Sequence, residues 1–265
     1  NGMGTTFGGI GKLAKGPWLF EAGLFEFRTH SETNFADFLR GVKADGSASS
    51  RTIIYDPDSE TRSFSGEGRV TRLFRMGAVE HRIIVSARGR VKDRLFGGVQ
   101  RIDLGPSSAI TPDFQAKPVL LPQVKDEDHV QQMNWGLAYG FKWLDRGSVD
   151  LSVSHTSYTK KLDFADVRLP VLETRDNPIL VTAAGSVRLN RHLSLYGGYV
   201  RGLEEALIAP DVATNRSEAP PAIRTRQIDF GLRYGVTPKL TLVAGLFSVS
   251  KPYFNLDPSM RYRQL

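Results

Sequence analysis

The stretch MNWGLAYGFKW, residues 133–143, carries a large apolar side chain at every second position. Small or polar residues occupy the positions between them. Only an extended strand sends alternate side chains to opposite faces, so this period of two predicts a β-strand with one apolar face. The large residues are Met133, Trp135, Leu137, Tyr139, Phe141 and Trp143.

The same alternation recurs along the chain and predicts about ten strands, although it is broken in the three at 5–12, 17–29 and 63–75. Clear examples are SVDLSVSH at 148–155, QIDFGLRY at 227–234 and KLTLVAGL at 239–246. No amphipathic helix pattern of similar clarity competes with them. The expected strands lie at residues 5–12, 17–29, 63–75, 80–95, 129–144, 148–159, 177–189, 191–203, 225–236 and 239–251.

The predicted connections alternate strictly between short and long. The long ones lie at residues 30–62, 96–128, 160–176 and 202–224. This alternation is typical of an up-and-down meander, in which short turns share one rim and long loops share the other. The Pro- and Ala-rich stretch 209–222 is interpreted as a surface loop within one domain, because the strand pattern resumes at Gln227.

The apolar faces fit a membrane. No apolar run approaches the ~18 residues of a spanning helix, so a membrane crossing requires strands. Trp135 and Trp143 are eight residues apart, which at ~3.3 Å per residue and a tilt of about 45° spans about 19 Å of bilayer thickness. This suits the two interfaces of a bilayer, where Tyr199 and Tyr234 are also expected. The residues expected to face the membrane are Trp135, Leu137, Tyr139, Phe141, Trp143, Leu151, Ile228, Phe230, Leu232 and Tyr234. The alternative is the interior of a soluble sandwich or small barrel.

The opposite face of one strand favours a wet lumen. In HRIIVSARGRVKDR, residues 81–94, five cations fall on one side, and a row of like charges needs water or anions beside it. The net charge of +7 agrees with an anionic partner. The cations are Arg82, Arg88, Arg90, Lys92 and Arg94. A solvated outer face of a soluble sheet is the alternative.

The sequence predicts no enzyme, no cofactor and no metal site. The five histidines are scattered without ligand spacing, and Ser154 and His155 face opposite sides of one strand. An Asp/His site of an outer-membrane protease, built from loops, is the enzyme alternative. The basic stretch SARGRVKDR lacks the interleaved aromatics of single-strand binders, so no nucleic acid is expected.

Residues 196–254 carry a longer pattern of motifs. It runs through Gly202, Leu203, Glu204, Ala209, Pro210, Asn215, Glu218, Pro221, Thr225, Gln227, Asp229, Gly231, Arg233, Tyr234, Leu246, Phe247, Lys251 and Pro252. This pattern resembles the C-terminal half of TonB-dependent outer-membrane receptors, particularly the siderophore-receptor type. The family's N-terminal plug, its TonB box and its aromatic-ended last strand have no counterpart in the sequence.

The resemblance implies an all-β fold, an antiparallel up-and-down transmembrane β-barrel present in part, as about ten strands of a larger barrel. Residues 1–265 would form one barrel-fragment domain. The implied function is uptake of a ferric siderophore or similar anionic ligand across the bacterial outer membrane, with outer-membrane lipid around the barrel and the TonB complex acting through the plug. Candidate contacts at the barrel mouth are Arg201, Glu204, Asn215, Arg216 and Glu218.

Two alternatives stay open beside this interpretation. Solvated loop polarity accounts equally for the five residues at the mouth. The alternative function is a soluble basic β-barrel or sandwich that binds polyanions.

Overall fold

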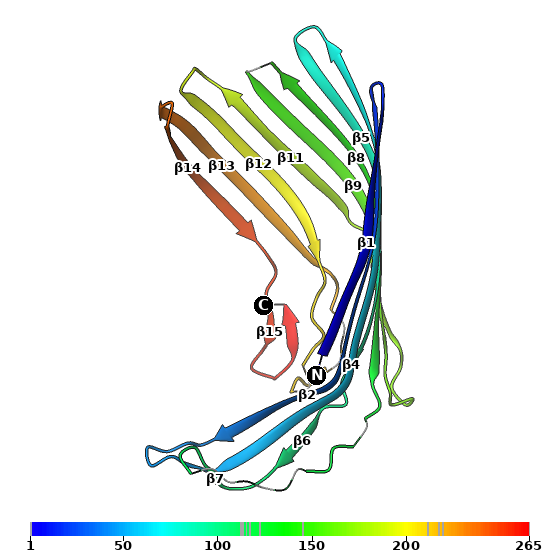
Figure 1. The fold of residues 1–265 in the computed structure, drawn as a ribbon, viewed down its shortest axis with the longest axis vertical. Coiled ribbons are helices and arrows are strands. Elements are labelled where there is room, and N and C mark those ends of the chain that lie inside the picture. The colour runs from blue at the N-terminus through cyan, green and yellow to red at the C-terminus, as the bar shows by residue number, and fades with distance from the viewer. Residues whose placement is uncertain are drawn as a thin grey trace.

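The computed structural model describes residues 2–111, 114, 116, 118–121, 123–144, 146–210, 212–216, 218 and 220–264. Its main feature is one large antiparallel sheet, curled into an open trough (Figure 1). In the described residues no helix is long and apolar enough to cross a membrane.

Ten long strands follow one another across the sheet in chain order, each antiparallel to the next. They are β1 (Gly2–Lys15), β2 (Trp18–Arg40), β4 (Ser50–Met76), β5 (Val79–Phe96), β8 (Asp126–Trp143), β9 (Gly147–Asp163), β11 (Ile179–Arg188), β12 (Leu193–Glu204), β13 (Ile223–Thr237) and β14 (Leu240–Ser250). The prediction of an all-β up-and-down sheet is confirmed. Within the described chain β1 and β14 each have one neighbour, so the ten strands do not close on themselves.

Six short strands complete the described part of the chain. β6 (Gln100–Asp103) pairs with β4, and β10 (Leu172–Asp176) pairs with β9. Two further pairs lie outside the main sheet: β3 (Ser47–Ala48) with β7 (Ser107–Ser108), and β15 (Phe254–Leu256) with β16 (Tyr262–Gln264). All six belong to the long-loop half of the molecule, whereas the short turns lie together at the other rim (Figure 1).

The long connection predicted at residues 30–62 is wrong. β2 and β4 continue as paired strands as far as Arg40 and Ser50, so the actual turn is residues 41–49. This extension mixes polar pairs such as Asn34 with Asp56 and apolar pairs, and the apolar pairs Phe35 with Tyr55 and Ala36 with Ile54 lie on opposite faces. The extension therefore lacks the apolar alternation by which a half-buried strand is recognised in a sequence.

The register sorts the side chains onto two faces. Trp135 lies opposite Ala87 and His155, whereas Arg90 lies opposite Ser65 and Gln132. We call the first the apolar face and the second the polar face. Relative exposures of 58% for Trp135, 47% for Leu151 and 56% for Phe230 show that the apolar face does not pack into an enclosed core.

The described residues of the segment 205–222 pack on the polar face, inside the trough (Figure 1). Ala222 joins Val130 and Tyr158 in a small buried cluster, against which Leu203 also packs. The described part of this segment is a loop, as expected, but it does not lie wholly at the surface: Val212 is exposed, whereas its small apolar residues Ala206, Ala209, Ala213 and Ala222 are buried.

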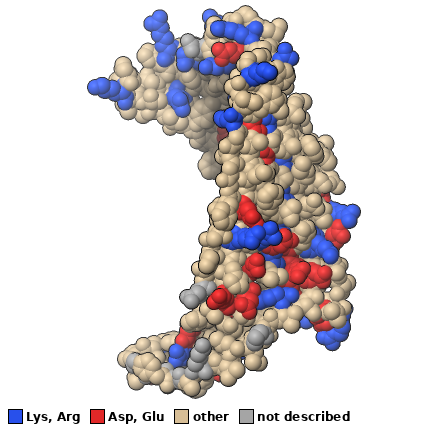
Figure 2. Space-filling model, turned by 45° about the vertical axis from the view of Figure 1, so that its right-hand side comes forward, with Lys and Arg blue, Asp and Glu red and all other residues tan. Residues whose placement is uncertain are grey.

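Charged groups are unevenly distributed along the trough. On the side that Figure 2 shows, they gather at the short-turn rim and in a belt toward the long loops. The surface between these two zones is mostly uncharged (Figure 2). A weakly charged band bounded by charged zones is the pattern expected of a barrel surface in a bilayer.

Candidate functional site

The five cations predicted on one side of a strand lie on the polar face of β5. Their neighbours on β4 and β8 are mainly polar: Glu67 and Asn134 flank Arg88, and Ser65 and Gln132 flank Arg90. This face is therefore hydrophilic across several strands. Figure 1 shows the trough that it lines.

Two of the five cations form ion pairs. Arg82 Nη2 lies 2.6 Å from Asp150 Oδ1, and Lys92 Nζ lies 2.6 Å from Glu205 Oε1. Within the described residues, Arg88, Arg90 and Arg94 have no carboxylate at salt-bridge distance. The positive charge of the row is thus concentrated in these three arginines.

The three arginines differ in how they are held. Arg90 Nε donates to Ser63 Oγ at 3.3 Å, and the Arg94 guanidinium lies over the Phe96 ring, 5.6 Å from its centroid. Arg88 lines a hollow of about 370 Å³ together with residues that include Glu67 and Arg69. These contacts leave guanidinium N–H groups available to an anion in the trough.

A buried charge cluster that the sequence did not reveal lies next to this row. Lys160 Nζ is 3.3 Å from Glu205 Oε1 and 3.4 Å from Asp128 Oδ2, and the Lys160 and Asp128 side chains are almost fully buried. Lys160 also donates to the Ala206 carbonyl at 3.3 Å. Glu205 thus joins the wall lysines Lys92 and Lys160 to the segment 205–222.

The electrostatics of Glu205 follow from this position. Burial by itself would raise the pKa of Glu205, but the hydrogen bond and charge of Lys92 and the charge of Lys160 outweigh it and lower the pKa. The carboxylate is therefore ionised at neutral pH. Sequence analysis missed this group because its partner Lys92 is 113 positions away.

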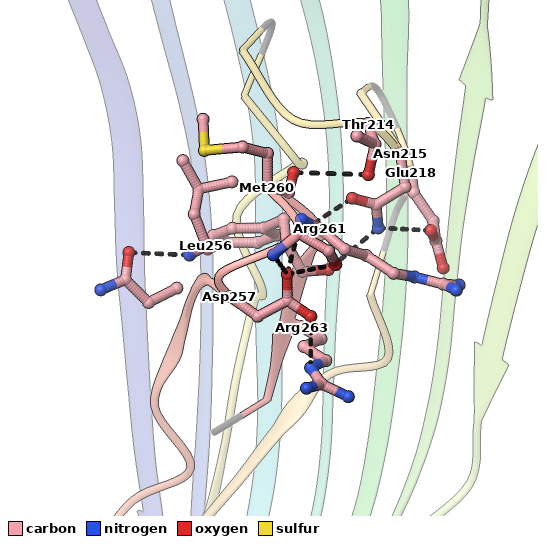
Figure 3. A network of polar contacts seen from close by, with 11 residues as sticks. Thr214, Asn215, Glu218, Leu256, Asp257, Met260, Arg261 and Arg263 are labelled. Atoms are coloured by element: carbon pink, nitrogen blue, oxygen red, sulfur yellow. Dashed lines mark hydrogen bonds and ion pairs between the residues drawn. The ribbon is translucent and has the colours of Figure 1, made fainter.

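Asn215 and Glu218, predicted at the mouth, lie together against the β15–β16 hairpin (Figure 3). Asn215 Nδ2 donates to the Tyr262 carbonyl at 2.9 Å, and the Tyr262 N–H donates to Asn215 Oδ1 at 2.8 Å. Asn215 Nδ2 also lies 2.5 Å from Glu218 Oε2. The Asn215 amide therefore holds the hairpin against the segment 205–222.

The hairpin turn has a capping carboxylate of its own. Asp257 Oδ1 accepts hydrogen bonds from Ser259 Oγ at 2.6 Å and from the Arg261 N–H at 2.9 Å (Figure 3). Arg263 Nε lies 2.8 Å from Asp257 Oδ2. The Ser259 hydroxyl, followed by the Arg261 N–H, lowers the pKa of Asp257.

The other three mouth candidates are separated from one another. Glu204 forms an ion pair with Lys251, and Arg216 is held through its backbone N–H, 3.1 Å from the Ala213 carbonyl. Arg201 Nε donates to Tyr199 Oη at 2.8 Å, two residues earlier on the same strand. Arg201 therefore lies on the apolar face, opposite to the side of the sheet that carries Lys92.

All ten residues predicted to face the membrane lie on the apolar face by register. Near the short-turn rim this face carries cation–ring contacts: the Arg72 guanidinium is 5.2 Å from the Trp18 ring centroid, and that of Arg146 is 5.1 Å from the Trp143 centroid. Trp18 was not among the predicted residues. Its strand begins with WLFEAGLF, in which Leu19 and Phe25 place large apolar side chains on the polar face as well, so the alternation is obscured.

Among the described residues, no group of three or more His, Asp or Glu side chains is placed to hold a metal ion.

Several solved siderophore receptors contain a similar sheet. The ferric preacinetobactin receptor BauA of Acinetobacter baumannii matches with a TM-score of 0.73 and 20% identity, over 97% of this chain and 38% of BauA. The ferric-catecholate import receptor Fiu of E. coli K12 matches with a TM-score of 0.72 and 13% identity, over 99% of this chain and 43% of Fiu. P. aeruginosa FpvA, solved with bound heterologous pyoverdines, matches with a TM-score of 0.73 and 13% identity, over 98% of this chain and 36% of FpvA.

The chain thus spans less than half the length of each of these receptors. No protein-family model and no curated protein matches the sequence. At such low identities the likeness shows the fold. The resemblance of residues 196–254 to TonB-dependent outer-membrane receptors of the siderophore type is confirmed at that level. The neighbours named are receptors rather than enzymes.

Proposed function

We propose that this chain is part of the barrel wall of a TonB-dependent outer-membrane receptor that takes up a ferric siderophore or a similar anionic chelate. The observation that carries the proposal is the opposition of the two faces of one sheet. Large side chains such as Trp135 and Phe230 are exposed along one face, whereas the other carries arginines and the chain's own segment 205–222. Receptor barrels combine an apolar exterior with a polar interior in this way.

The exposed apolar face supports contact with outer-membrane lipid. Burying such side chains in hydrocarbon removes apolar surface from water, which stabilises the barrel. Rings beside cations, such as Trp18 with Arg72, suit the interface between hydrocarbon and headgroups. The alternative, a soluble sandwich that binds polyanions, requires this face to pack inside the protein, and Trp135 and Phe230 are exposed instead.

The polar face supports passage of an anion. Arg88, Arg90 and Arg94 lack carboxylate partners in the described chain, and positive charge in a confined channel attracts anions by focusing the field. Lys92 has a different role in this proposal, because Glu205 engages it. No bond is made or broken by these residues, so the chain acts in transport without a chemical step.

The remaining parts of the proposal follow from the receptor architecture. Residues 1–265 form a single barrel domain, and energy reaches the complete receptor through a plug that contacts the TonB complex. Figure 1 shows an open sheet, and in the described chain β1 and β14 each pair with one strand only, which supports further wall strands beside them in the complete receptor.

The steering role is tested in the full-length receptor by replacing Arg88, Arg90 and Arg94 together with Gln. Uptake of 55Fe-loaded catecholate, hydroxamate and citrate chelates is measured at low and at physiological salt. We expect slower uptake of the chelate the receptor normally transports, with the difference largest at low salt because salt screens steering. The matched control replaces Arg188, Arg191 and Arg75 near the short-turn rim with Gln. Uptake by the Arg88/Arg90/Arg94 variant equal to that of the control would refute the steering role.

A further inference from the structure

Two arginines lie directly opposite each other on the apolar face. Arg201 of β12 and Arg226 of β13 are Cα partners, and Arg226 pairs on its other side with Ser250 of β14. The hydrogen bond from Arg201 Nε to Tyr199 Oη fixes the Arg201 guanidinium beside that ring. Both arginine residues are exposed.

This pair carries uncompensated charge. Like charges directly opposite each other on neighbouring strands destabilise a sheet. In the part of the chain that the structure describes, no carboxylate lies at salt-bridge distance from Arg201 or Arg226. The nearby carboxylate of Asp176 is paired with Arg224, 2.6 Å away, and therefore does not neutralise Arg201 or Arg226. The pair therefore fits an anion from outside the chain.

On other strands of the apolar face, carboxylates of the chain itself pair with the cations. Where the apolar residues of β2 end, Glu26 lies 2.7 Å from Arg28 and 2.9 Å from Arg62 of β4. Where those of β5 end, Asp93 lies 2.5 Å from His129 of β8. Arg201 and Arg226 occupy the corresponding position on β12 and β13, so their lack of a carboxylate is a departure from the pattern of this face.

An exposed apolar strip adjoins the two arginines. On the same face of β13, toward the short-turn rim, lie Ile228 and Phe230, and Phe230 has Leu246 of β14 as its Cα partner. Leu246 is 81% exposed and Phe230 is 56% exposed. Two guanidinium forks beside such a strip match an amphiphile with an anionic head and acyl chains. Guanidinium groups bind phosphate oxygens in bidentate fashion.

We propose that Arg201 and Arg226 bind the phosphate of an acylated lipid in the leaflet nearest the long loops. The acyl chains lie along Ile228, Phe230 and Leu246, and Tyr199 marks the boundary between hydrocarbon and headgroup. The inference rests on the membrane placement proposed above. It adds a lipid site on the outside of the wall, separate from the path of the imported ligand.

The test uses the full-length receptor in a neutral detergent, with native mass spectrometry to count bound lipid. The probes are bisphosphorylated lipid A, its dephosphorylated form and inorganic phosphate. The Arg201→Gln/Arg226→Gln variant should bind bisphosphorylated lipid A at least about tenfold more weakly than the wild type. The control Arg188→Gln/Arg191→Gln removes the same charge at the other rim and should bind as the wild type does. Arg201→Lys/Arg226→Lys keeps the charge and should retain part of the binding.

Three results would overturn the inference. Equal lipid A binding by the Gln variant and the wild type is one, and equal binding of the dephosphorylated form is another. The third is inorganic phosphate competing as strongly as lipid A, which would make the site one for free anions. A wild-type receptor that stays in aqueous solution without detergent would contradict the proposed function itself. Membrane-integrated wild type with unchanged lipid binding in the variant contradicts only the lipid site.

Discussion

Glu205 accepts a hydrogen bond from Lys92 at 2.6 Å, although 113 positions separate the two residues in the chain. Lys160 approaches the same carboxylate at 3.3 Å from a different strand. One side chain therefore fastens the segment 205–222 to two strands of the wall. The strength of this attachment is open to direct measurement.

Replacing Glu205 with Gln should release the segment 205–222. The change leaves Lys92 without its counter-charge and leaves the buried Lys160 with Asp128 alone, and breaking a largely buried ion pair in this way costs roughly 3 kcal/mol. We expect a lower melting temperature in detergent and faster proteolytic cleavage within 205–222. The control Glu173→Gln removes an exposed pair with Arg175 and should change stability by less than about 1 kcal/mol. Equal protease resistance of both variants would show that Glu205 does not anchor the segment.

Acidification should loosen the same segment. Because the folded state lowers the pKa of Glu205 below its ordinary value of 4.5, the stabilisation is fully present above pH 4.5 and is lost as the pH falls through the folded-state pKa. Hydrogen exchange in residues 205–222, corrected for its intrinsic pH dependence, should increase over that range. In Glu205→Gln the same correction should give a flat profile. A wild-type profile that is equally flat would exclude control by this carboxylate.

Replacing Asn215 with Ala should free the β15–β16 hairpin. The substitution removes both hydrogen bonds to the Tyr262 backbone, each worth about 1 kcal/mol. The Tyr262 amide should then exchange about tenfold faster or more. Arg216→Ala is the control, since this neighbour is held through its backbone. Asn215→Asp keeps the acceptor for the Tyr262 N–H and loses the donor, so its exchange rate should be intermediate; a rate matching that of the Ala variant would contradict the assignment of the two bonds.

A charge on the apolar face should have a cost that depends on depth. Leu137 lies between Val85 and Val153, whereas Gln131 lies on the same face of β8 toward the long loops. In a bilayer, Leu137→Arg should destabilise the full-length receptor by about 2–4 kcal/mol and Gln131→Arg by about 0–1 kcal/mol. Denaturant titrations in lipid vesicles measure both. In a protein whose apolar face is in water, both exposed substitutions would stay within about 0.5 kcal/mol.

Most of the main strands were predictable because one face is apolar and the other polar, so that alternate residues differ in type, as Trp135 and Asn134 do. β1 and β2 were less predictable in their bounds, because residues such as Ile10 and Phe25 add apolar side chains to the polar face. The extension of β2 and β4 beyond Ser31 was not predictable in the same way. Its adjacent pairs Phe35 with Tyr55 and Ala36 with Ile54 place apolar side chains on both faces, so the sequence there has no apolar period of two.

The candidate site was likewise predictable where it depends on neighbouring residues of one strand, and not where it depends on distant parts of the chain. The row from Arg82 to Arg94 lies on one strand, so its common face follows from local geometry. The partners that distinguish its members, Asp150 for Arg82 and Glu205 for Lys92, come from distant parts of the chain. Arg201 was grouped with the mouth residues because of its place in the chain, and only the register shows that it lies on the side of Tyr199.

The open sheet leaves a row of unused backbone N–H and C=O groups along the 14 residues of β1 and another along the 11 residues of β14. Such unpaired strand edges are templates for further strand pairing, either with the neighbouring strand of a complete barrel or with another copy of the same chain. Produced in isolation, this chain should therefore form fibrous or amorphous aggregates unless a complementary strand pairs with each of the two edges.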